Sequence, residues 1–485
     1  MVESPSRWDG LCARPSLPPP PRPSVPPDRV SPLRPGAGSR LIEPVTDDGE
    51  GVRRTTGVSA LSGGREVARP DGTVLRNWAG NHAYAAERVH DPRDVSELRD
   101  IVGRLERVHA LGTRHSFTDL ADTTGDLVST QQMPADLEID AERRVVRVGS
   151  GVRYGLLAEH LVRRDWALAS MASLPHISVA GAVATGTHGS GDRTGSLASA
   201  VAAVELVAAD GELRRVERGD PEFEGYVVSL GALGVVTHLE LDIEPTYTVR
   251  QDVYTDLAWD VAVEHLDELT ASAYSVSLFT DWLSGRIQQV WLKSRDTTPP
   301  TDLWGARPAG ETLHMLAGAD VEAVTRQGGI VGAWHRRLPH FEMDFTPSRG
   351  EELQSEYLVP RGAAAEAIER LRALAPAYAD LLQVAEVRTV AADDLWLSGA
   401  QGHDVVALHF TWLRDVEGVY AVLPAIEEAL LPLAARPHWG KCFVADAEAL
   451  RALYPHFDDF RALAGRVDPL GKFHNPFLLR HLGLG

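Results

Sequence analysis

Two short segments combine small residues with histidine, and each follows a predicted strand. They are GTRHSF over 112–117 and SLPHISVAGAVATGTHGSG over 173–191. A packed core would use larger residues, so such backbone is suited to lie close to a large, partly polar ligand. Backbone N–H groups in Gly-rich turns form anion-binding concavities, which hold a pyrophosphate without Lys or Arg. A dinucleotide such as FAD fits these segments, and the alternative is a pair of purely structural turns.

The second half of the chain carries polar side chains at alternate positions of predicted strands, so that each pair shares one strand face. These pairs are Glu386 with Arg388 in EVRTV and His409 with Thr411 in HFTW, and they are followed by His438 and Lys441 in RPHWGK. Together they offer hydrogen-bond donors and acceptors suited to an uncharged, polyhydroxylated ligand. For the charged pair, a solvated salt bridge is the alternative.

Several common site types lack their sequence signatures. No HExxH, paired CxxC or other metal-ligand spacing occurs, and the 18 histidines are scattered, so we expect no metal site. The GxGxxG and GxxxxGK[ST] fingerprints are missing too. A Rossmann dehydrogenase and a P-loop enzyme are therefore excluded.

The composition limits which classes of partner the protein binds and indicates its cellular compartment. The net charge of −20 argues against a nucleic-acid surface and an anionic membrane, both of which require clustered Lys and Arg. Cys12 and Cys442 are the two cysteines, which excludes a disulfide framework, and no apolar run of 18 residues exists. We expect a cytoplasmic monomer that binds small molecules.

The elements needed to position these residues indicate an α+β fold. Helices are predicted over 95–108, 154–164, 360–379 and 448–467, and aromatic-rich strands over 274–282, 286–293 and 405–413. Residues 196–218 are predicted to form a helix that runs into a strand and a hairpin. The strands and helices lack the regular spacing of a doubly wound nucleotide fold. From about Tyr247 the pattern favours a second α+β domain built on an antiparallel sheet. Residues 296–331, with weak periodicity, are expected to form a long surface excursion.

Residues 1–70 differ from the rest, because PSLPPPPRPSVPP allows neither a helix nor a central strand. The composition predicts a disordered tail. A proline-rich ligand for a partner domain and an over-extended start of the reading frame are the alternatives.

Ten motifs, in this order, resemble the alditol (xylitol) oxidases, which are vanillyl-alcohol-oxidase-like flavoproteins with a PCMH-type FAD domain. The motifs are NWAGN, GTRHSF, MASLPHISVAGAVATGTHGSG, GALGVVT, AYSVSLFTDW, LQSEYLVPR, EVRTVAADDLWL, HFTW, RPHWGK and DPLGKFHN, and they extend from Leu75 to the C-terminus. The resemblance implies a two-subdomain FAD-binding domain with an inserted substrate domain. It places the FAD domain at 71–246, the substrate domain at 247–435, and a C-terminal segment that returns to the FAD domain at 436–485.

The resemblance also implies the cofactor residues. It assigns the covalent bond to the flavin 8α position to His115, rather than to His176 or His188. In many relatives a small residue precedes this histidine, whereas here Arg114 does. The expected FAD contacts are Ala110, Leu111, Gly112, Thr113, Arg114, His115, Ser116, Ser173, Ser178, Gly181, Ala182, Val183, Ala184, Thr185, Val236 and His438.

The reaction that the resemblance implies is oxidation of a terminal primary alcohol to an aldehyde, with hydride transfer to flavin N5 and reoxidation by O2 to hydrogen peroxide. The alditol is expected to bind Ser173, Glu386, Arg388, Thr411 and Lys441. Lys441 and Arg388 are expected to hold and polarise the reacting hydroxyl, while His409 helps to accept its proton. Arg is not a base near neutral pH, whereas a Lys crowded by a cation and partly buried is able to be one.

Two rival functions stay open at this point. An aldonolactone oxidase or dehydrogenase of the same superfamily would oxidise a sugar lactone and pass electrons to O2, a protein or a quinone. SLPHISVAG, EVRTV and HFTW favour the alditol branch, and the small residue Ala172 is expected near the flavin, where it bears on oxygen access. The other rival is a flavin-free sugar-binding module whose Gly-rich turns are structural.

Overall fold

The first half of the described chain contains two larger sheets and one short two-stranded pair. The computed structural model describes residues 74–295, 298–345 and 351–485, and the predicted tail lies outside these residues. A parallel sheet has the order β1-β3-β2, and an antiparallel sheet has the order β4-β5-β9-β7-β8. Their strands are β1 (Arg88–His90), β2 (Val108–Leu111), β3 (Asp126–Ser129), β4 (Glu138–Asp140), β5 (Val145–Gly149), β7 (Val201–Val207), β8 (Leu213–Glu217) and β9 (Val235–Asp242).

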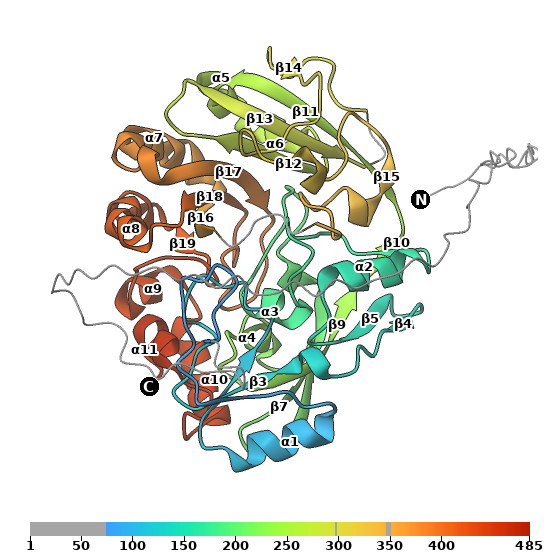
Figure 1. Ribbon diagram of the computed structural model, residues 1–485, viewed down its shortest axis with the longest axis vertical. Helices are drawn as coiled ribbons and strands as arrows, with labels where there is room; N and C mark the ends of the chain where they lie inside the picture. Colours follow the sequence, from blue (N-terminus) through green and yellow to red (C-terminus); the bar gives the residue numbers. More distant parts are fainter. Residues whose placement is uncertain (1–73, 296–297, 346–350) are drawn as a thin grey trace, which may run out of the picture. The chain divides into compact units, whose positions relative to one another are not determined.

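The second half forms one large antiparallel sheet, drawn in green to orange in Figure 1. Within the described ranges its order is β14-β11-β13-β12-β17-β18-β16-β19, and β15 also pairs with β11. These strands are β11 (Thr248–Ala258), β12 (Ser275–Thr280), β13 (Arg286–Ser294), β14 (Arg307–Pro308), β15 (Gly332–Ala333), β16 (Glu352–Pro360), β17 (Leu382–Val390), β18 (Val405–Leu413) and β19 (Arg436–Pro437). A short pair, β6 (Trp166–Ala167) with β10 (Glu244–Pro245), lies outside it.

Helices lie against these sheets, and α7 and α8 pack side by side against β16 (Figure 1). The first-half helices are α1 (Val95–Arg104), α2 (Tyr154–Val162), α3 (Val179–Ala184) and α4 (Phe223–Val227). The others are α5 (Trp259–Glu264), α6 (Leu266–Ala271), α7 (Ala364–Leu374), α8 (Val416–Leu430), α9 (Ala447–Leu453), α10 (Phe457–Val467) and α11 (Pro476–Leu482). The mixture of helices with parallel and antiparallel strands confirms the α+β class.

Local sequence explains where several helices begin and end. The Asp94 carboxylate caps α1 by accepting a hydrogen bond from the Glu97 N–H. The helix predicted over 448–467 is two helices, because Pro455 lies between α9 and α10 and cannot continue a helix. The helix predicted at the start of 196–218 is a single 3₁₀ turn, Leu197–Ala200, that leads directly into β7.

Strand β18 places aromatic side chains in the core on one face and polar side chains at the cavity on the other. Phe410 and Trp412 stack with ring centroids 4.9 Å apart, and Tyr378 lies edge-on to both rings. His409 and Thr411 point to the opposite face, because successive side chains alternate. The aromatic pair thus fixes the strand against the core while the polar pair stays available to a ligand.

The C-terminal segment bonds to the first half of the chain. The Val108 N–H donates to the Lys472 carbonyl at 2.9 Å, and the Asn475 side chain donates to the Leu120 carbonyl at 2.8 Å. Nearer the sheet, the Phe117 N–H donates to the Gly440 carbonyl at 2.8 Å. Residues far apart in the sequence are thereby held together on both sides of the loop after β2.

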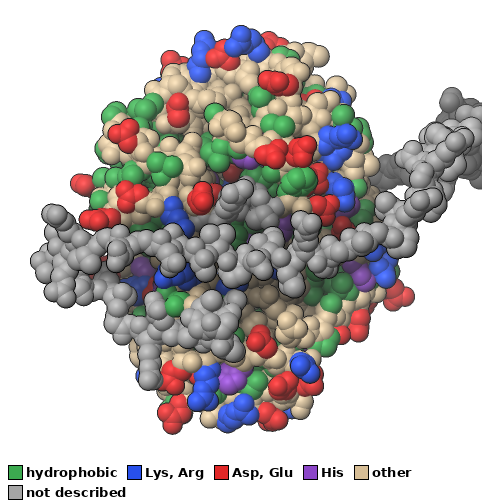
Figure 2. All heavy atoms as spheres, in the orientation of Figure 1, with side chains coloured by type: hydrophobic (Ala, Val, Ile, Leu, Met, Phe, Trp, Pro, Cys, Tyr) green, Lys and Arg blue, Asp and Glu red, His purple; other side chains and the backbone are tan. Residues whose placement is uncertain are grey.

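The surface of the described residues mixes both signs of charge, and Figure 2 shows acidic side chains interspersed with basic ones on the visible face. Among the described residues, no helix combines the length and the apolar character needed to span a bilayer.

Candidate active site

A cavity of about 310 Å³ is lined by segments from both halves of the described chain. It brings together every predicted site residue except Val183, which is 2% exposed and packs in the hydrophobic core beneath α3. The predicted residues that line it are Ala110, Leu111, Gly112, Thr113, Arg114, His115, Ser116, Ser173, Ser178, Gly181, Ala182, Ala184, Thr185, Val236, Glu386, Arg388, His409, Thr411, His438 and Lys441.

The loop after β2 presents His115 to this cavity. Arg114 has φ +65°, the left-handed region that glycine adopts without strain, so this loop keeps a shape that usually favours a residue without Cβ. The Arg114 carbonyl accepts from the Trp78 N–H at 2.8 Å, and its guanidinium donates to the Arg76 carbonyl at 2.9 Å. The Trp78 ring stacks on the His115 ring at 5.4 Å, so the imidazole is fixed in orientation.

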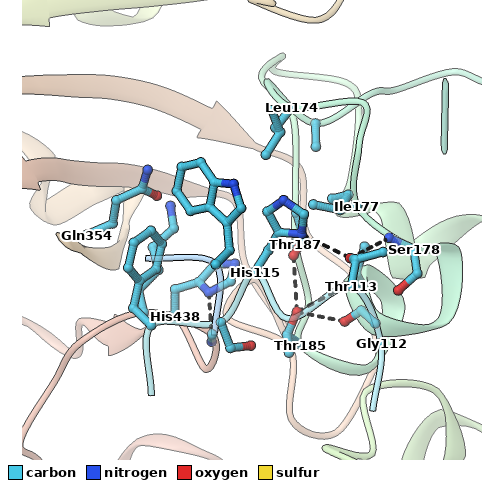
Figure 3. A pocket seen from close by; sticks show the side chains of 18 of the residues that line it. Gly112, Thr113, His115, Leu174, Ile177, Ser178, Thr185, Thr187, Gln354 and His438 are labelled. Carbon is cyan, nitrogen blue, oxygen red and sulfur yellow. Dashed lines mark hydrogen bonds between the residues drawn. The ribbon is translucent and has the colours of Figure 1, made fainter. Parts of the chain in front are cut away.

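Thr113 connects the two small-residue segments (Figure 3). Its Oγ1 lies 3.0 Å from His115 Nδ1 and accepts a hydrogen bond from the Ser178 N–H at 3.1 Å. Burial, together with the nearby His176 and Arg153, lowers the pKa of His115 to about 4. The His115 imidazole is therefore neutral near pH 7 and keeps a lone pair on one nitrogen.

The second small-residue segment includes α3 and approaches the first very closely. A Cβ on either Gly112 or Gly181 would lie 2.8 Å from Ser178 Oγ, so a side chain at either position would require the Ser178 hydroxyl to move. The hydroxyls of Ser150 and Ser178 are buried beside the cavity and have no hydrogen-bond partner within the described residues. Buried hydroxyls are normally paired, so these two fit a polar ligand lying across the segment.

On the opposite wall, strand register aligns a row of side chains across four strands of the large sheet. Phe279 on β12 pairs with Glu386 on β17, Glu386 pairs with His409 on β18, and His409 pairs with Glu356 on β16. Directly opposed residues point to the same face, so all four line the cavity. Arg388 lies two residues beyond Glu386 on that face.

Glu356 is the centre of the charges on this face, and its side chain is fully buried. It accepts from Arg388 Nη2 at 2.6 Å and from Lys441 Nζ at 2.7 Å, and His188 Nε2 lies 3.2 Å away. Burial alone would raise the pKa of Glu356, but Lys441, His188 and Arg388 together hold it well below its usual range. The carboxylate is therefore ionised and orients both cations.

Lys441 contacts two acceptors beside the cavity. Its Nζ donates to Glu356 and lies 2.8 Å from His409 Nδ1, while His409 Nε2 lies 3.1 Å from Thr411 Oγ1. Burial and the neighbouring Arg388 lower the pKa of Lys441, although Glu356 opposes this. Burial and Lys441 also hold the pKa of His409 well below its usual range. His409 is thus a neutral acceptor toward Lys441.

The segment expected to be a surface excursion over 296–331 is partly buried, which corrects that prediction. His314, Met315 and Leu316 line the cavity, and the His314 side chain is buried. The Gln327 amide holds the Leu313 backbone through bonds of 2.9 and 2.7 Å. The weak periodicity reflects a chain fixed by backbone and side-chain hydrogen bonds rather than by a helix or a long strand.

Ser173 joins the stretch around residues 340–341 to the large sheet. Arg388 Nη1 donates to its hydroxyl at 3.3 Å, and the N–H groups of His340 and Phe341 donate to its carbonyl at 3.0 and 3.2 Å. His176 Nε2 lies 2.9 Å from the Met343 carbonyl. Both histidines of the second small-residue segment thus have protein partners. His176 contacts the Met343 carbonyl, and His188 contacts the Glu356 carboxylate.

The residues that the sequence did not indicate include Trp78, Ser150, Glu356, Lys293 and His340. The same alternation that indicated Glu386 and Arg388 was present in ELQSE, where Gln354 and Glu356 share a face of β16. The position of Trp78 beside His115 and the contact of Lys293 with His340 depend on the tertiary fold, and no sequence signal indicated them.

Comparisons with known proteins agree with this geometry. Residues 86–217 match the FAD binding domain family, and residues 342–481 match the D-arabinono-1,4-lactone oxidase family. The chain is 50% identical over 409 residues to an alditol oxidase from a Streptomyces species, covering 84% of this chain and 98% of that one. It is 30% identical over 431 residues to an L-gulono-1,4-lactone dehydrogenase of Mycobacterium tuberculosis, covering 84% and 99%. A crystal structure of cholesterol oxidase from B. sterolicum has a similar fold, with a TM-score of 0.69 and 15% identity over 83% of this chain and 95% of that one.

Proposed function

The chain belongs to the alditol oxidases, within the vanillyl-alcohol-oxidase-like flavoproteins, and from this premise we propose that it oxidises the terminal primary hydroxyl of an alditol to an aldose while O2 is reduced to hydrogen peroxide. One observation carries the proposal most directly. A row of buried donors and acceptors, Glu386, His409 and Glu356 with their cations, faces the two small-residue segments across one cavity.

FAD is the cofactor, and the first half of the chain supplies its binding segments. The Gly112 and Gly181 backbones and the unpaired hydroxyls of Ser150 and Ser178 would hold it. When bound, FAD would supply the redox chemistry, because it accepts a hydride, which carries two electrons, from the alcohol carbon and passes those two electrons to O2.

The covalent attachment falls to His115. Bond formation to the flavin 8α carbon requires a nitrogen with a free lone pair, and the lowered pKa of His115 keeps the ring neutral at physiological pH. Stacking on Trp78 and the contact with Thr113 hold the ring in one orientation. These features support His115 over His176 and His188.

The alditol would bind on the sheet face with its hydroxyls against Ser173, Glu386, Arg388, Thr411 and Lys441. Such a site discriminates by hydrogen bonding, because buried groups left unpaired by the wrong ligand weaken its binding.

Lys441 is the proposed base. A neutral amine has two N–H donors, which match Glu356 and His409 Nδ1, and its lone pair is then left for the reacting hydroxyl. His409 already accepts from Lys441, so we assign it the role of orienting Lys441 rather than of taking the proton directly. Arg388 stays charged and polarises the hydroxyl oxygen.

The proposed domain organisation assigns each range of the chain to the cofactor or to the substrate. We propose an FAD domain at 71–246, a substrate domain at 247–435, and a segment at 436–485 that returns to the FAD domain. The hydrogen bonds of Lys472 and Asn475 to the first half support the last assignment. Ala172 lines the cavity, and we propose that its small side chain bears on the access of O2.

One experiment distinguishes alditol oxidation from the alternative oxidation of a sugar lactone. Purified protein is mixed with xylitol, sorbitol and an aldono-1,4-lactone in parallel, and hydrogen peroxide is measured with O2 as the sole acceptor. Peroxide formation with the alditols and not with the lactone is expected. Turnover of the lactone in preference to both alditols would contradict the proposal.

A further inference from the structure

A second line of buried polar groups reaches the cavity along the same face of the large sheet. Lys293 on β13 is completely buried, and its Nζ lies 2.5 Å from the Leu338 carbonyl, 3.0 Å from the Pro339 carbonyl and 3.0 Å from His340 Nδ1. His340 Nε2 in turn lies 2.7 Å from Glu386 Oε1. The three side chains therefore form one continuous chain that ends at a cavity carboxylate.

The charge state of Lys293 decides the direction of these hydrogen bonds. An ammonium group has three donors and no acceptor, and here three acceptors surround it. His340 Nδ1 must then accept, so the His340 proton lies on Nε2 and is donated to Glu386 Oε1. The other oxygen, Glu386 Oε2, lies 3.5 Å from Arg388 Nε, and Glu386 lines the cavity.

On the basis of the proposed function, we propose that Lys293 and His340 are positioning residues for substrate binding. They fix the Glu386 carboxylate by occupying Oε1, so that Oε2 is presented to a hydroxyl of the alditol. Neither side chain performs chemistry on the reacting carbon. Their effect is on the affinity for a polyhydroxylated ligand.

The aromatic surroundings explain why this chain of contacts is rigid. The His340 ring lies 5.2 Å from the Trp291 ring and 5.6 Å from the Phe279 ring, and both aromatic side chains are buried. The His340 N–H is bonded to the Ser173 carbonyl. The imidazole is thus held on several sides, and its tautomer is the remaining variable.

The tautomer of His340 depends on pH through the protonation state of Lys293. Burial lowers the pKa of Lys293 to about 7, with Glu386 opposing and Arg388 adding to the shift. Burial and Lys293 lower the pKa of His340 to about 4, so His340 is neutral when Lys293 titrates. A neutral Lys293 amine has only two N–H donors, which the two carbonyls satisfy, and its lone pair then favours the proton on His340 Nδ1. Nε2 would face Glu386 without a proton, and the carboxylate would lose its support.

The test measures the rate of flavin reduction by xylitol under anaerobic conditions in the holoenzyme, because its concentration dependence separates the xylitol Kd from the limiting rate. Lys293→Met is expected to raise Kd by about 10-fold or more, with the limiting rate changed by less than about 3-fold. In the wild type, Kd should rise as pH increases through about 7, whereas Lys293→Met should show a high Kd without this step.

His340→Gln tests the same mechanism with the Lys293 side chain and its two carbonyl acceptors kept. Its side-chain amide donates to Glu386 without a choice of tautomer, so Kd should stay within about 3-fold of the wild type while the pH step disappears. This variant decides the question if Lys293→Met fails to fold.

Gln251→Met is the matched control. Gln251 pairs directly with Lys293 across β11 and β13, is equally buried, and donates to the Thr325 carbonyl at 3.0 Å. It supports the same loop, because the Thr325 N–H donates to the His340 carbonyl. An equal rise of the xylitol Kd in Gln251→Met and Lys293→Met would overturn the inference. A rise of Kd with pH that persists in both Lys293→Met and His340→Gln would overturn it too. No flavin reduction by xylitol in the wild type would overturn the proposed function and this inference with it.

Discussion

Replacing Lys441 by Met removes the proposed base while keeping a side chain of similar length. The variant loses the Nζ contacts to Glu356 at 2.7 Å and to His409 at 2.8 Å. Glu356 keeps its bond from Arg388 at 2.6 Å and its contact with His188 at 3.2 Å, so the buried carboxylate is not left without a partner.

The magnitudes follow from these contacts. Loss of a positioned general base lowers a rate by roughly 10²- to 10⁴-fold, which corresponds to about 3–5 kcal/mol in the barrier. Breaking a buried ion pair by removing one partner typically costs about 3–5 kcal/mol of unfolding free energy. Because Arg388 still neutralises Glu356, we expect a stability loss below that range.

The assay is stopped-flow flavin reduction by xylitol, together with the absorbance spectrum of the bound flavin. The spectrum and flavin content should match the wild type, while reduction slows by at least about 100-fold. Lys472→Met is the control, since Lys472 is also buried but donates to the Val102 carbonyl outside the cavity. Reduction within about 3-fold of the wild-type rate in Lys441→Met would refute the assignment.

Three further outcomes are expected. His115→Ala should release all flavin on acid precipitation, whereas wild-type precipitate stays yellow; a yellow precipitate from the variant would contradict the covalent role. Glu356→Gln should shift the rising limb of the flavin-reduction rate to lower pH, because Glu356 raises the pKa of Lys441 and its neutralisation lets the amine lose its proton earlier; an unchanged pH profile would argue against Lys441 as base. Arg114→Ala should be less stable than Arg114→Gly by about 1 kcal/mol in denaturant unfolding, because both lose the guanidinium but only alanine carries a Cβ at φ +65°; equal stabilities would show that the loop relaxes.

Period-2 patterns in the sequence were enough to indicate much of the sheet side of the site. The alternation in EVRTV and HFTW correctly placed Glu386 with Arg388 and His409 with Thr411 on faces that line the cavity. The same alternation places Glu356 on a strand face, but it does not reveal that Glu356 contacts Arg388, Lys441 and His188. Those contacts depend on which strands lie beside β16, such as β18. Sequence spacing contains no information on which strands pair.

Helix predictions were accurate where local chemistry decides and inaccurate where it does not. The Asp94 cap fixed the start of α1, whereas Pro455 divided one predicted helix into α9 and α10. The predicted surface excursion was partly wrong because its buried contacts, such as the paired bonds of Gln327, are long-range and leave no periodic pattern.

By itself the sequence determined the α+β class, the small-residue segments and the family, because composition, alternation and ordered motifs are local properties of the chain. Only the tertiary structure decided which groups meet. Trp78 stacks on His115, Val183 points into the core, and Lys293 reaches Glu386 through His340. These contacts depend on strand register and on loops that close over the sheet, and both arise from packing between segments far apart in the chain.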